Sequence, residues 1–390
     1  MKVYYISPST IPSRSANLVH VLFMTEALSN LGHKVTLFLH SNKHNSDKCI
    51  DIVKNSHDID SNIFNIIVYK GSFKRGNELG IAIYSLIFYL KDLLKGVAPA
   101  SIISRNLYGA FLLGILMRKS LIYETHTPEI GFRKYIQNSL VASKKIQTVV
   151  ISNSLRQLIL RNKIHLSERV HVFHDAARSG RIALDSVQRS ILKKDLLNSM
   201  PNKQSFAKII GYFGHLYPGR GIEVIQSLAN KHPEFAFVVY GGNDKEIEIF
   251  KNNNKTSNLL FMGHLNQRAV YEKMSTMDVL LMPYQKQVSI GVDSVDTSKW
   301  MSPMKMFEYM SASVPIISSD LPVLREVLVH NENCILVQPD DIDSWSKALK
   351  NIFSSNFLYK KLSENSYNDY LNAYTWNIRS KKILELSSEK

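Results

Sequence analysis

Short runs of apolar, β-branched and aromatic residues alternate along this chain with stretches in which apolar residues recur every three or four positions. The first pattern predicts buried strands and the second predicts amphipathic helices, because side chains repeat every 2 residues on a strand and every 3.6 on a helix. Regular alternation of the two is typical of an α/β fold on a parallel sheet. In the first half of the chain, strands are predicted at 3–7, 35–39, 66–69, 102–104, 121–124, 148–151 and 170–173.

A second series of the same kind follows a polar segment at about 177–206 that has weak periodicity. Its predicted strands are 209–213, 235–240, 259–262, 279–283, 315–318 and 334–337. Helices are predicted at 17–31, where Gly32 ends the helix, at 222–231, and over most of the chain after 342. The pattern predicts two Rossmann-like domains, at 1–180 and 207–370, with 181–206 as the linker. Ligands of such domains bind at the carboxyl ends of the strands, so we expect a site in a cleft that the two domains face.

Composition narrows the class of protein. The 390 residues are enough for two hydrophobic cores, and the two cysteines, Cys49 and Cys334, form no metal or redox motif. The net charge of +15 is uneven: residues 1–190 carry 25 Lys and Arg against 12 Asp and Glu, and residues 191–390 carry 23 against 21. An excess of +13 in one half suggests a basic face for an anionic partner, although charge spread for solubility would also explain it. No DNA- or RNA-binding motif is present, so nucleic acid is not the expected partner.

The segment 300–310 predicts a helix that begins beside an anion site. Ser302 suits the N-cap and Pro303 the first helical position, so the first turn would present unpaired backbone N–H groups. Lys305 adds a positive charge there, and Glu308, on the same face, could accept hydrogen bonds from a ribose diol. The alternative is an ordinary capped surface helix with an ion pair between Lys305 and Glu308.

A glycine-rich turn opens the second series at residues 211–221, between a predicted strand and a predicted helix. Gly214 and Gly219 permit close backbone approach to a phosphate, and Arg220 could bind the phosphate with two N–H groups. The spacing fits neither the dinucleotide-binding pattern nor a P-loop. A tight turn needed for packing would explain the glycines but not Arg220.

Taken together, these two motifs resemble the donor site of the family-4 glycosyltransferases, including those of bacterial surface-polysaccharide synthesis. Between them, the strand that ends in Gly263 and His264 resembles the family strand beside the nucleobase, and the run 278–283 resembles the strand before the donor loop. The resemblance implies the GT-B arrangement of two Rossmann-like domains, with the acceptor bound by the first domain and a nucleotide-diphosphate sugar by the second. It also implies a C-terminal helix, at 371–390, that packs back on the first domain.

The resemblance further implies a retaining, metal-independent transfer with no cofactor, to a hydroxyl of a glycan or lipid-linked acceptor. Arg220 and Lys305 would hold the diphosphate, and Glu308 would hold the ribose. Other donor-site contacts are expected from the following residues: Gly214, Gly219, Gly263, His264, Ser302 and Met304. A UDP-sugar is the preferred donor over a GDP-sugar.

Two departures from the family pattern concern the donor site. Trp300 stands where the family has the first Glu of its E-x7-E pattern, and Asp293 or Asp296 could substitute for that Glu. His215 replaces the usual Arg of the glycine-rich loop.

In the first domain, the resemblance points to two segments. Ser15, Ala16 and Asn17 stand where the family has a small-residue loop near the donor phosphate and the acceptor. His126, after a predicted strand, resembles a histidine near the reacting centre, although a structural histidine at a strand end is the alternative. His20 could line the acceptor site.

Two other functions stay open. A sugar-nucleotide 2-epimerase would have the same architecture, and a carbohydrate- or nucleotide-binding subunit without activity would explain Trp300. The expected location is the cytoplasm, peripheral to the inner face of the cell membrane.

Membrane contact is expected from the basic residues of the first domain. The candidates are Lys70, Lys74, Arg75, Lys91, Lys95, Arg118, Lys119, Arg133, Lys134, Lys144 and Lys145. The apolar runs 81–94 and 107–117 are too short to span a membrane. They are expected to be buried core helices, and shallow insertion into the membrane surface is the alternative.

Overall fold

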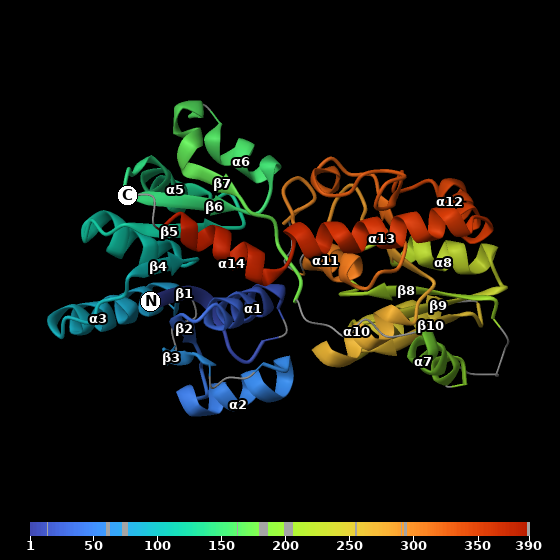
Figure 1. The fold of residues 1–390 in the computed structure, drawn as a ribbon, viewed down its shortest axis with the longest axis horizontal. Coiled ribbons are helices and arrows are strands. Elements are labelled where there is room, and N and C mark those ends of the chain that lie inside the picture. The colour runs from blue at the N-terminus through green and yellow to red at the C-terminus, as the bar shows by residue number, and fades with distance from the viewer. Residues whose placement is uncertain are drawn as a thin grey trace. The chain divides into compact units, whose positions relative to one another are not determined.

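The computed structural model describes residues 1–13, 15–59, 63–71, 77–161, 163–178, 186–198, 206–253, 256–289, 291 and 295–387. The chain forms two compact units, which are Met1–Arg178 with Thr375–Lys390, and Ser179–Tyr374. Each unit is a parallel sheet with helices packed along it (Figure 1). The prediction of two parallel α/β domains is therefore confirmed.

The first unit contains a seven-stranded sheet in the order β3-β2-β1-β4-β5-β6-β7. Its strands are β1 (Lys2–Thr10), β2 (Lys34–His40), β3 (Asn65–Tyr69), β4 (Ser101–Ser104), β5 (Leu121–Thr125), β6 (Ile146–Val150) and β7 (Val170–Val172). Its helices are α1 (Ala16–Asn30), α2 (Ser46–His57), α3 (Asn77–Leu94), α4 (Leu107–Ala110), the π-helix η2 (Phe111–Leu116), α5 (Gly131–Ala142), α6 (Asn153–Leu160), the 3-10 helix η3 (Ile164–Arg169) and α14 (Trp376–Glu385). Chain order along the sheet reverses at β1, which pairs with both β2 and β4. A crevice at the carboxyl ends of β1 and β4 is therefore the expected ligand position in this unit.

The second unit contains a six-stranded sheet in the order β10-β9-β8-β11-β12-β13. Its strands are β8 (Lys208–Phe213), β9 (Phe235–Tyr240), β10 (Leu259–Gly263), β11 (Val279–Met282), β12 (Ile316–Ser319) and β13 (Ile335–Val337). Its helices are α7 (Ser186–Asn198), α8 (Ile222–Lys231), α9 (Asp244–Asn253), α10 (Gln267–Ser275), α11 (Met304–Ser311), the 3-10 helix η5 (Leu324–Glu326), α12 (Ile342–Ser354) and α13 (Asn356–Ala373). The reversal in this sheet lies at β8, which pairs with β9 and β11.

Burial explains why these runs form strands. All residues of β5, β9, β11 and β12 are buried, which is the expected state of central parallel strands covered on both faces. Each strand predicted from the sequence lies within three residues of an observed one at both ends, because continuous apolar runs of this length suit only such positions.

The segment expected as a linker contains a helix. Within 181–206, α7 is ordered against the second unit, where Lys193 Nζ lies 2.7 Å from both carboxylate oxygens of Asp278. Leu196 is the buried residue of this helix. The helix was not predicted because its apolar periodicity is weak and most of its surface is polar.

The two apolar runs of the first unit are not fully buried. The run 81–94 lies in α3, which buries Ile81, Ala82, Ser85 and Tyr89 and exposes apolar residues on another face. The run 107–117 forms α4 and η2, and Leu116 at its end is 61% exposed. The expectation of core helices is therefore wrong for the outer face of α3. Among the described residues, no helix is long and apolar enough to cross a bilayer.

Candidate functional site

The glycine-rich turn after β8 is held by close backbone contacts. A Cβ atom at Gly219 would lie 1.9 Å from the carbonyl oxygen of Gln287, and one at Gly221 would lie 1.9 Å from that of Pro283. Both glycines have positive φ, 82° and 78°. These two positions therefore need glycine for packing within the unit, whatever ligand the turn binds.

Arg220 stands between those glycines, and its guanidinium contacts the segment that follows β11. Its Nη1 donates to the Tyr284 hydroxyl at 3.0 Å and its Nη2 donates to the Ser289 carbonyl oxygen at 3.0 Å. The buried Nε makes no hydrogen bond among the described residues. The guanidinium is thus fixed by its own unit while part of its donor capacity stays unused.

Lys305 lies beside this arginine. Its Nζ is 3.8 Å from the ring centroid of Tyr212 and 5.2 Å from that of Tyr284. A Cβ atom at Gly214 would lie 2.7 Å from both Cε and Nζ of Lys305, so glycine at 214 makes room for the ammonium group. Burial, reinforced by the charge of Arg220, holds the pKa of Lys305 well below its usual range, while Glu308 opposes the shift. Two cations held close together in this way would be stabilised by an anion.

The helix that carries Lys305 begins one residue later than predicted. Pro303, in extended conformation, is the N-cap of α11 and contributes no side-chain hydrogen bond, so the prediction of Ser302 as N-cap is wrong. Ser302 is buried just before the helix, and Met304 is the first helical residue. Because Pro303 supplies no side-chain cap, the backbone N–H groups of this first turn and the positive end of the helix dipole are suited to an anion.

Glu308 is oriented by helix α10. Its Oε1 accepts hydrogen bonds from Gln267 Nε2 at 3.0 Å and from the Tyr271 hydroxyl at 3.1 Å. In the described part of the chain, no salt bridge joins Glu308 to Lys305, so the alternative of a simple ion-paired surface helix is not what forms. Fixed donors on one carboxylate oxygen leave the group oriented for a further partner.

The remaining donor-side residues lie at the carboxyl end of the same sheet. Gly263 ends β10 with φ of 75°, and His264 follows it. The carbonyl oxygen of Gly263 accepts a hydrogen bond from Gly241 N at 2.7 Å. A Cβ atom at Gly263 would stand in open space. His215 stacks on Tyr217 with centroids 4.8 Å apart, and burial, with the charges of Arg220 and Lys305, lowers the pKa of His215. His215 therefore adds no positive charge in place of the family arginine at neutral pH.

Of the two candidates for the missing first Glu, the structure describes only Asp296. Asp296 Oδ1 accepts from the backbone N–H groups of Val288 and Ser298, each at 2.9 Å, so Asp296 stabilises its own loop. Asp293 lies outside the described residues.

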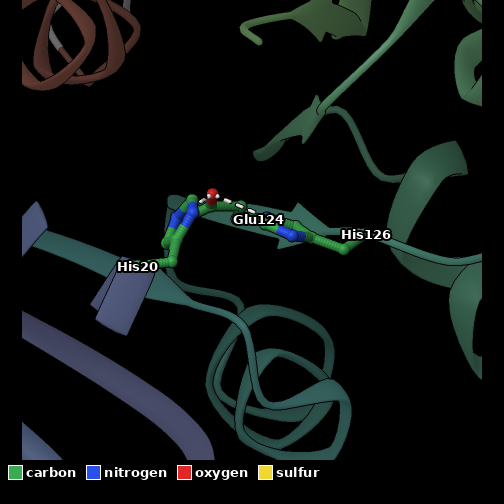
Figure 2. Close-up of side chains that lie close together, drawn as sticks. All are labelled: His20, Glu124 and His126. Atoms are coloured by element: carbon green, nitrogen blue, oxygen red, sulfur yellow. Dashed lines mark hydrogen bonds and ion pairs between the residues drawn. The ribbon is translucent and has the colours of Figure 1, made fainter. Parts of the chain in front are cut away.

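A buried charged cluster lies in the first unit, at the carboxyl ends of β5 and β7. Glu124 is 1% exposed, and Figure 2 shows it between the imidazoles of His20 and His126. Its Oε1 is 2.7 Å from Arg379 Nη2 and 3.1 Å from His126 Nε2, and its Oε2 accepts from the Tyr5 hydroxyl at 3.1 Å. Burial acts to raise the pKa of Glu124, but the charge of Arg379 and the histidine contacts hold that pKa well below its usual range.

His20 completes the cluster from α1. Its Nδ1 lies 2.9 Å from Asp175 Oδ1, and its Nε2 lies 2.9 Å from Glu124 Oε1 without hydrogen-bond geometry. Burial acts to raise the pKa of Asp175, but His20 lowers it to about 2, so Asp175 is ionised and Nδ1 of His20 carries a proton.

The protonation of His126 follows from its two neighbours. Arg105 Nη2 lies 3.1 Å from His126 Nδ1, and a guanidinium can only donate, so Nδ1 is an acceptor. The ring proton is then on Nε2, which donates to Glu124. Burial and the charge of Arg105 lower the pKa of His126 to about 3. His126 is therefore a neutral histidine with both nitrogens engaged, and it cannot accept a proton from a substrate without breaking the contact with Arg105.

His20, Glu124 and His126 each offer one possible metal-ligand atom, and these three atoms lie within 4.8 Å of one another. The proton on His126 Nε2 removes the lone pair that a metal needs. Arg379 already places a cation at the Glu124 oxygen. The cluster therefore fits a neutralised charge network better than a divalent metal site.

The small-residue loop before α1 is partly committed to its own helix. Ser15 is the N-cap of α1 and accepts from Leu18 N at 3.3 Å, and Asn17 Nδ2 donates to Ser9 Oγ at 2.8 Å. Ala16 is exposed at the first position of the helix. These residues follow β1, the strand at which the order of the sheet reverses.

Comparison with known proteins agrees with this geometry. Residues 199–369, which include Arg220, Lys305 and Glu308, match the family described as glycosyl transferases group 1. That match covers 171 of the 390 residues. A part of the chain is 32% identical over 88 residues to the O-antigen chain mannosyltransferase RfbU of Salmonella typhimurium, which is 23% of this chain and 24% of that protein. The chain spans about a quarter of the length of the curated relatives it matches, 24% and 27%.

Solved structures resemble the whole chain. A glycosyltransferase from Rickettsia africae superposes with a TM-score of 0.72 at 13% identity, over 100% of this chain and 98% of that one. Anabaena HepE in complex with UDP-glucose superposes with a TM-score of 0.66 at 11% identity, over 100% of both chains. At these identities the likeness concerns the fold, which is that of the GT-B glycosyltransferases.

Several residues of these sites were not predicted from the sequence. Arg105, Asp175 and Arg379 in the first unit, and Tyr284 in the second, lie outside the motifs recognised in the sequence. Tyr212 lies within the glycine-rich run but was assigned no role. One signal was present: Glu124 is a carboxylate inside an apolar strand, and a buried carboxylate requires a cationic partner.

We expect the stability of the first unit to fall between pH 6.5 and pH 5 because of His126. An unfolded histidine takes up a proton near pH 6.5, whereas the folded His126 has its pKa lowered to about 3 and stays neutral. The unfolded state then binds more protons, so the free energy of unfolding decreases as pH falls. An Asn side chain can make both contacts of a neutral His126 but does not titrate. His126→Asn should therefore remove the part of the pH dependence of the free energy of unfolding that comes from His126. Urea unfolding at several pH values measures the free energy of unfolding of the parent and of the variant. If the difference between the two stayed constant from pH 7.5 to 5, the prediction would be contradicted.

Proposed function

We propose that this chain is a retaining glycosyltransferase that moves a sugar from a nucleotide-diphosphate sugar to a hydroxyl of a glycan or lipid-linked acceptor. The observation that carries the proposal is the pair of basic residues, Arg220 and Lys305, at the start of α11. A diphosphate is the anion that this arrangement suits best, and Glu308, one turn along the helix, is spaced for the adjoining ribose. UDP is the preferred nucleotide, and the UDP-glucose complex of the HepE relative supports that choice.

The proposed reaction breaks the bond between the anomeric carbon and the diphosphate oxygen, and the nucleotide leaves with the electron pair. Lys305, Arg220 and the helix dipole stabilise the negative charge that grows on the leaving oxygen. The acceptor oxygen forms its bond on the same face, and its proton passes to the departing phosphate. No metal ion is required, because the chain supplies the positive charge.

His126 has a supporting part in this proposal. It is neutral, and its nitrogens are occupied by Arg105 and Glu124. We assign it to the lining of the acceptor side, together with Ser15, Ala16 and Asn17, and not to proton transfer. A surface-polysaccharide acceptor is the proposed context, which the O-antigen relative supports.

The effect of replacing Glu308 on nucleotide affinity provides a direct test of the proposed donor site. Glu308→Ala should weaken UDP binding by about 10- to 100-fold, since two hydrogen bonds from a diol to a charged group are lost. Titration calorimetry with UDP, GDP and ADP measures this and also identifies the base. Glu272→Ala on α10, whose side chain is 49% exposed, is the matched control and should bind normally. Unchanged affinity in the Glu308 variant would remove this residue from the site.

Product analysis separates the proposal from its alternatives. An epimerase converts the sugar nucleotide without an acceptor, whereas the proposed transferase releases nucleotide only when acceptor is present. NMR of the glycoside product should show the anomeric configuration of the donor, and inversion would contradict the retaining mechanism.

A further inference from the structure

Helix α3 exposes a continuous apolar face. Its exposed residues are all apolar except Lys91. The exposed fractions are Leu79 45%, Ile83 47%, Ile87 42%, Leu90 37%, Leu93 42% and Leu94 89%. A surface helix of a monomeric protein normally carries polar residues at such positions, so this face requires an explanation.

Spacing aligns these side chains in one row. Leu79, Ile83, Ile87, Leu90 and Leu94 follow one another at intervals of four, four, three and four residues, and we call this row the α3 stripe. The buried residues Ile81, Ala82, Ser85 and Tyr89 occupy a different face, which packs on the unit. The stripe therefore runs along the whole 18-residue helix, at the margin of the first unit (Figure 1).

Helix α5 adds apolar side chains next to the start of the stripe. Arg133 Nη1 lies 2.7 Å from Glu78 Oε2, which joins the first turn of α5 to the first turn of α3. Around this arginine, Ile130 is 81% exposed, Phe132 is 73% exposed and Tyr135 is 72% exposed. Exposed aromatic and aliphatic side chains therefore flank, in sequence, the arginine that joins the two helices.

Charges around the stripe favour an anionic occupant. Lys91 and Lys95 are exposed at its C-terminal end. The two carboxylates of α3 are engaged: Glu78 by Arg133, and Asp92 by Lys2 and Tyr4. The local balance is positive, so a second copy of this face would bring like charges together, whereas acidic lipid head groups would be attracted.

We propose that α3 docks on an anionic lipid bilayer, lying in the plane of the membrane with the stripe inserted at the boundary of head groups and acyl chains. Lys91 and Lys95 then contact the acidic head groups. This differs from docking by charge alone, because apolar insertion persists when salt screens the charges. Two of the basic residues expected at the membrane, Lys74 and Arg75, lie outside the described residues, and the proposal does not use them.

Co-sedimentation with vesicles tests the stripe without any measurement of activity, so its outcome is independent of the proposed reaction. The parent protein should bind vesicles of phosphatidylglycerol and phosphatidylcholine, and part of the binding should remain at 0.5 M salt. Ile83→Gln with Ile87→Gln should reduce the ratio of bound to free protein at least about tenfold at both salt levels, because two aliphatic side chains no longer insert. Lys91→Gln with Lys95→Gln should reduce binding mainly at low salt.

Matched controls use exposed positions elsewhere in the same unit. Leu158, 41% exposed on α6, and Ile164, 79% exposed on η3, should tolerate Gln without loss of binding. A fluorescent probe on Cys introduced at Ile87 should move to an apolar environment with vesicles, whereas a probe at Ile164 should not; Cys49 and Cys334 are buried and should not react. Thermal unfolding verifies that each variant is folded.

Three outcomes would overturn the proposal. The parent could fail to bind anionic vesicles, or the two glutamines could leave binding unchanged. Alternatively, ultracentrifugation without lipid could show a dimer that Ile83→Gln with Ile87→Gln converts to monomer, in which case the stripe is an interface between copies of the chain.

Discussion

Replacing Lys305 with alanine should lower kcat by about 100- to 1,000-fold, with a smaller effect on the donor KM. The ammonium is held between Tyr212 and Tyr284 and next to Arg220, where its charge is costly until a leaving group develops negative charge beside it. Its interaction is therefore strongest in the transition state, which is the condition for an effect on kcat. Steady-state kinetics measures this, with a sugar of the nucleotide that the calorimetry selects and a glycan or lipid-linked acceptor.

The same substitution should not destabilise the fold, because it removes a partly buried cation. Since burial holds the pKa of Lys305 low, binding of a diphosphate should raise that pKa and drive proton uptake, which calorimetry in buffers of different ionisation enthalpy detects. Lys299→Ala, at an exposed position before the helix, is the control and should behave as the parent. A kcat near the parent value would exclude Lys305 from the leaving-group site.

Replacing Arg379 with methionine should destabilise the first unit by about 3–5 kcal/mol. The substitution leaves Glu124 buried without its closest cation, at 2.7 Å, and removes the donor to the His174 carbonyl oxygen at 2.9 Å. Native-state hydrogen exchange of β5 and α1 measures the effect on this unit separately from the other. Combining Arg379→Met with Glu124→Gln should recover part of the loss, because the two changes act on one interaction.

A surface ion pair serves as the comparison for that experiment. Lys361 Nζ lies 2.8 Å from Glu332 Oε1, with side chains 30% and 55% exposed. Lys361→Met should cost less than about 1 kcal/mol, since solvent screens such pairs. If Arg379→Met cost no more than Lys361→Met, the buried cluster would not be what secures α14 to its unit.

The fold was predictable from the sequence because its strands are almost wholly buried. Runs such as 235–240 and 279–283 are apolar without interruption, and only a covered parallel sheet accommodates many of them. The end of α1 could be predicted because Gly32 follows it. Gly32 adopts a positive φ, a conformation that ends helices and that glycine takes readily. The first residue of α11 was misplaced by one, because Ser302 is a good N-cap by residue type, although Pro303 takes the position.

The candidate sites were predictable in part. Residues close together in the sequence could be paired, whereas partners far apart in the sequence could not. Lys305 and Glu308 belong to one helix, so local spacing was enough to pair them with a glycine-rich turn. The partners of Glu124 lie far from it in the chain, and Arg379 follows it by 255 residues. Periodicity also could not tell which face of α3 is covered, because apolar residues occur all around that helix.

The discontinuity of the first unit has a consequence for how the protein is made. Residues up to Arg178 need α14 to complete their fold, and the whole second unit is translated in between. At 5–20 residues per second, a ribosome synthesises the interval from Glu124 to Arg379 in about 13–50 s. During that time the carboxylate has no Arg379 beside it, whereas residues 179–374 form an uninterrupted segment that can reach its native state first. The second unit should therefore be protected from protease on nascent chains before the first unit is, which reverses the usual order of folding from the N-terminus.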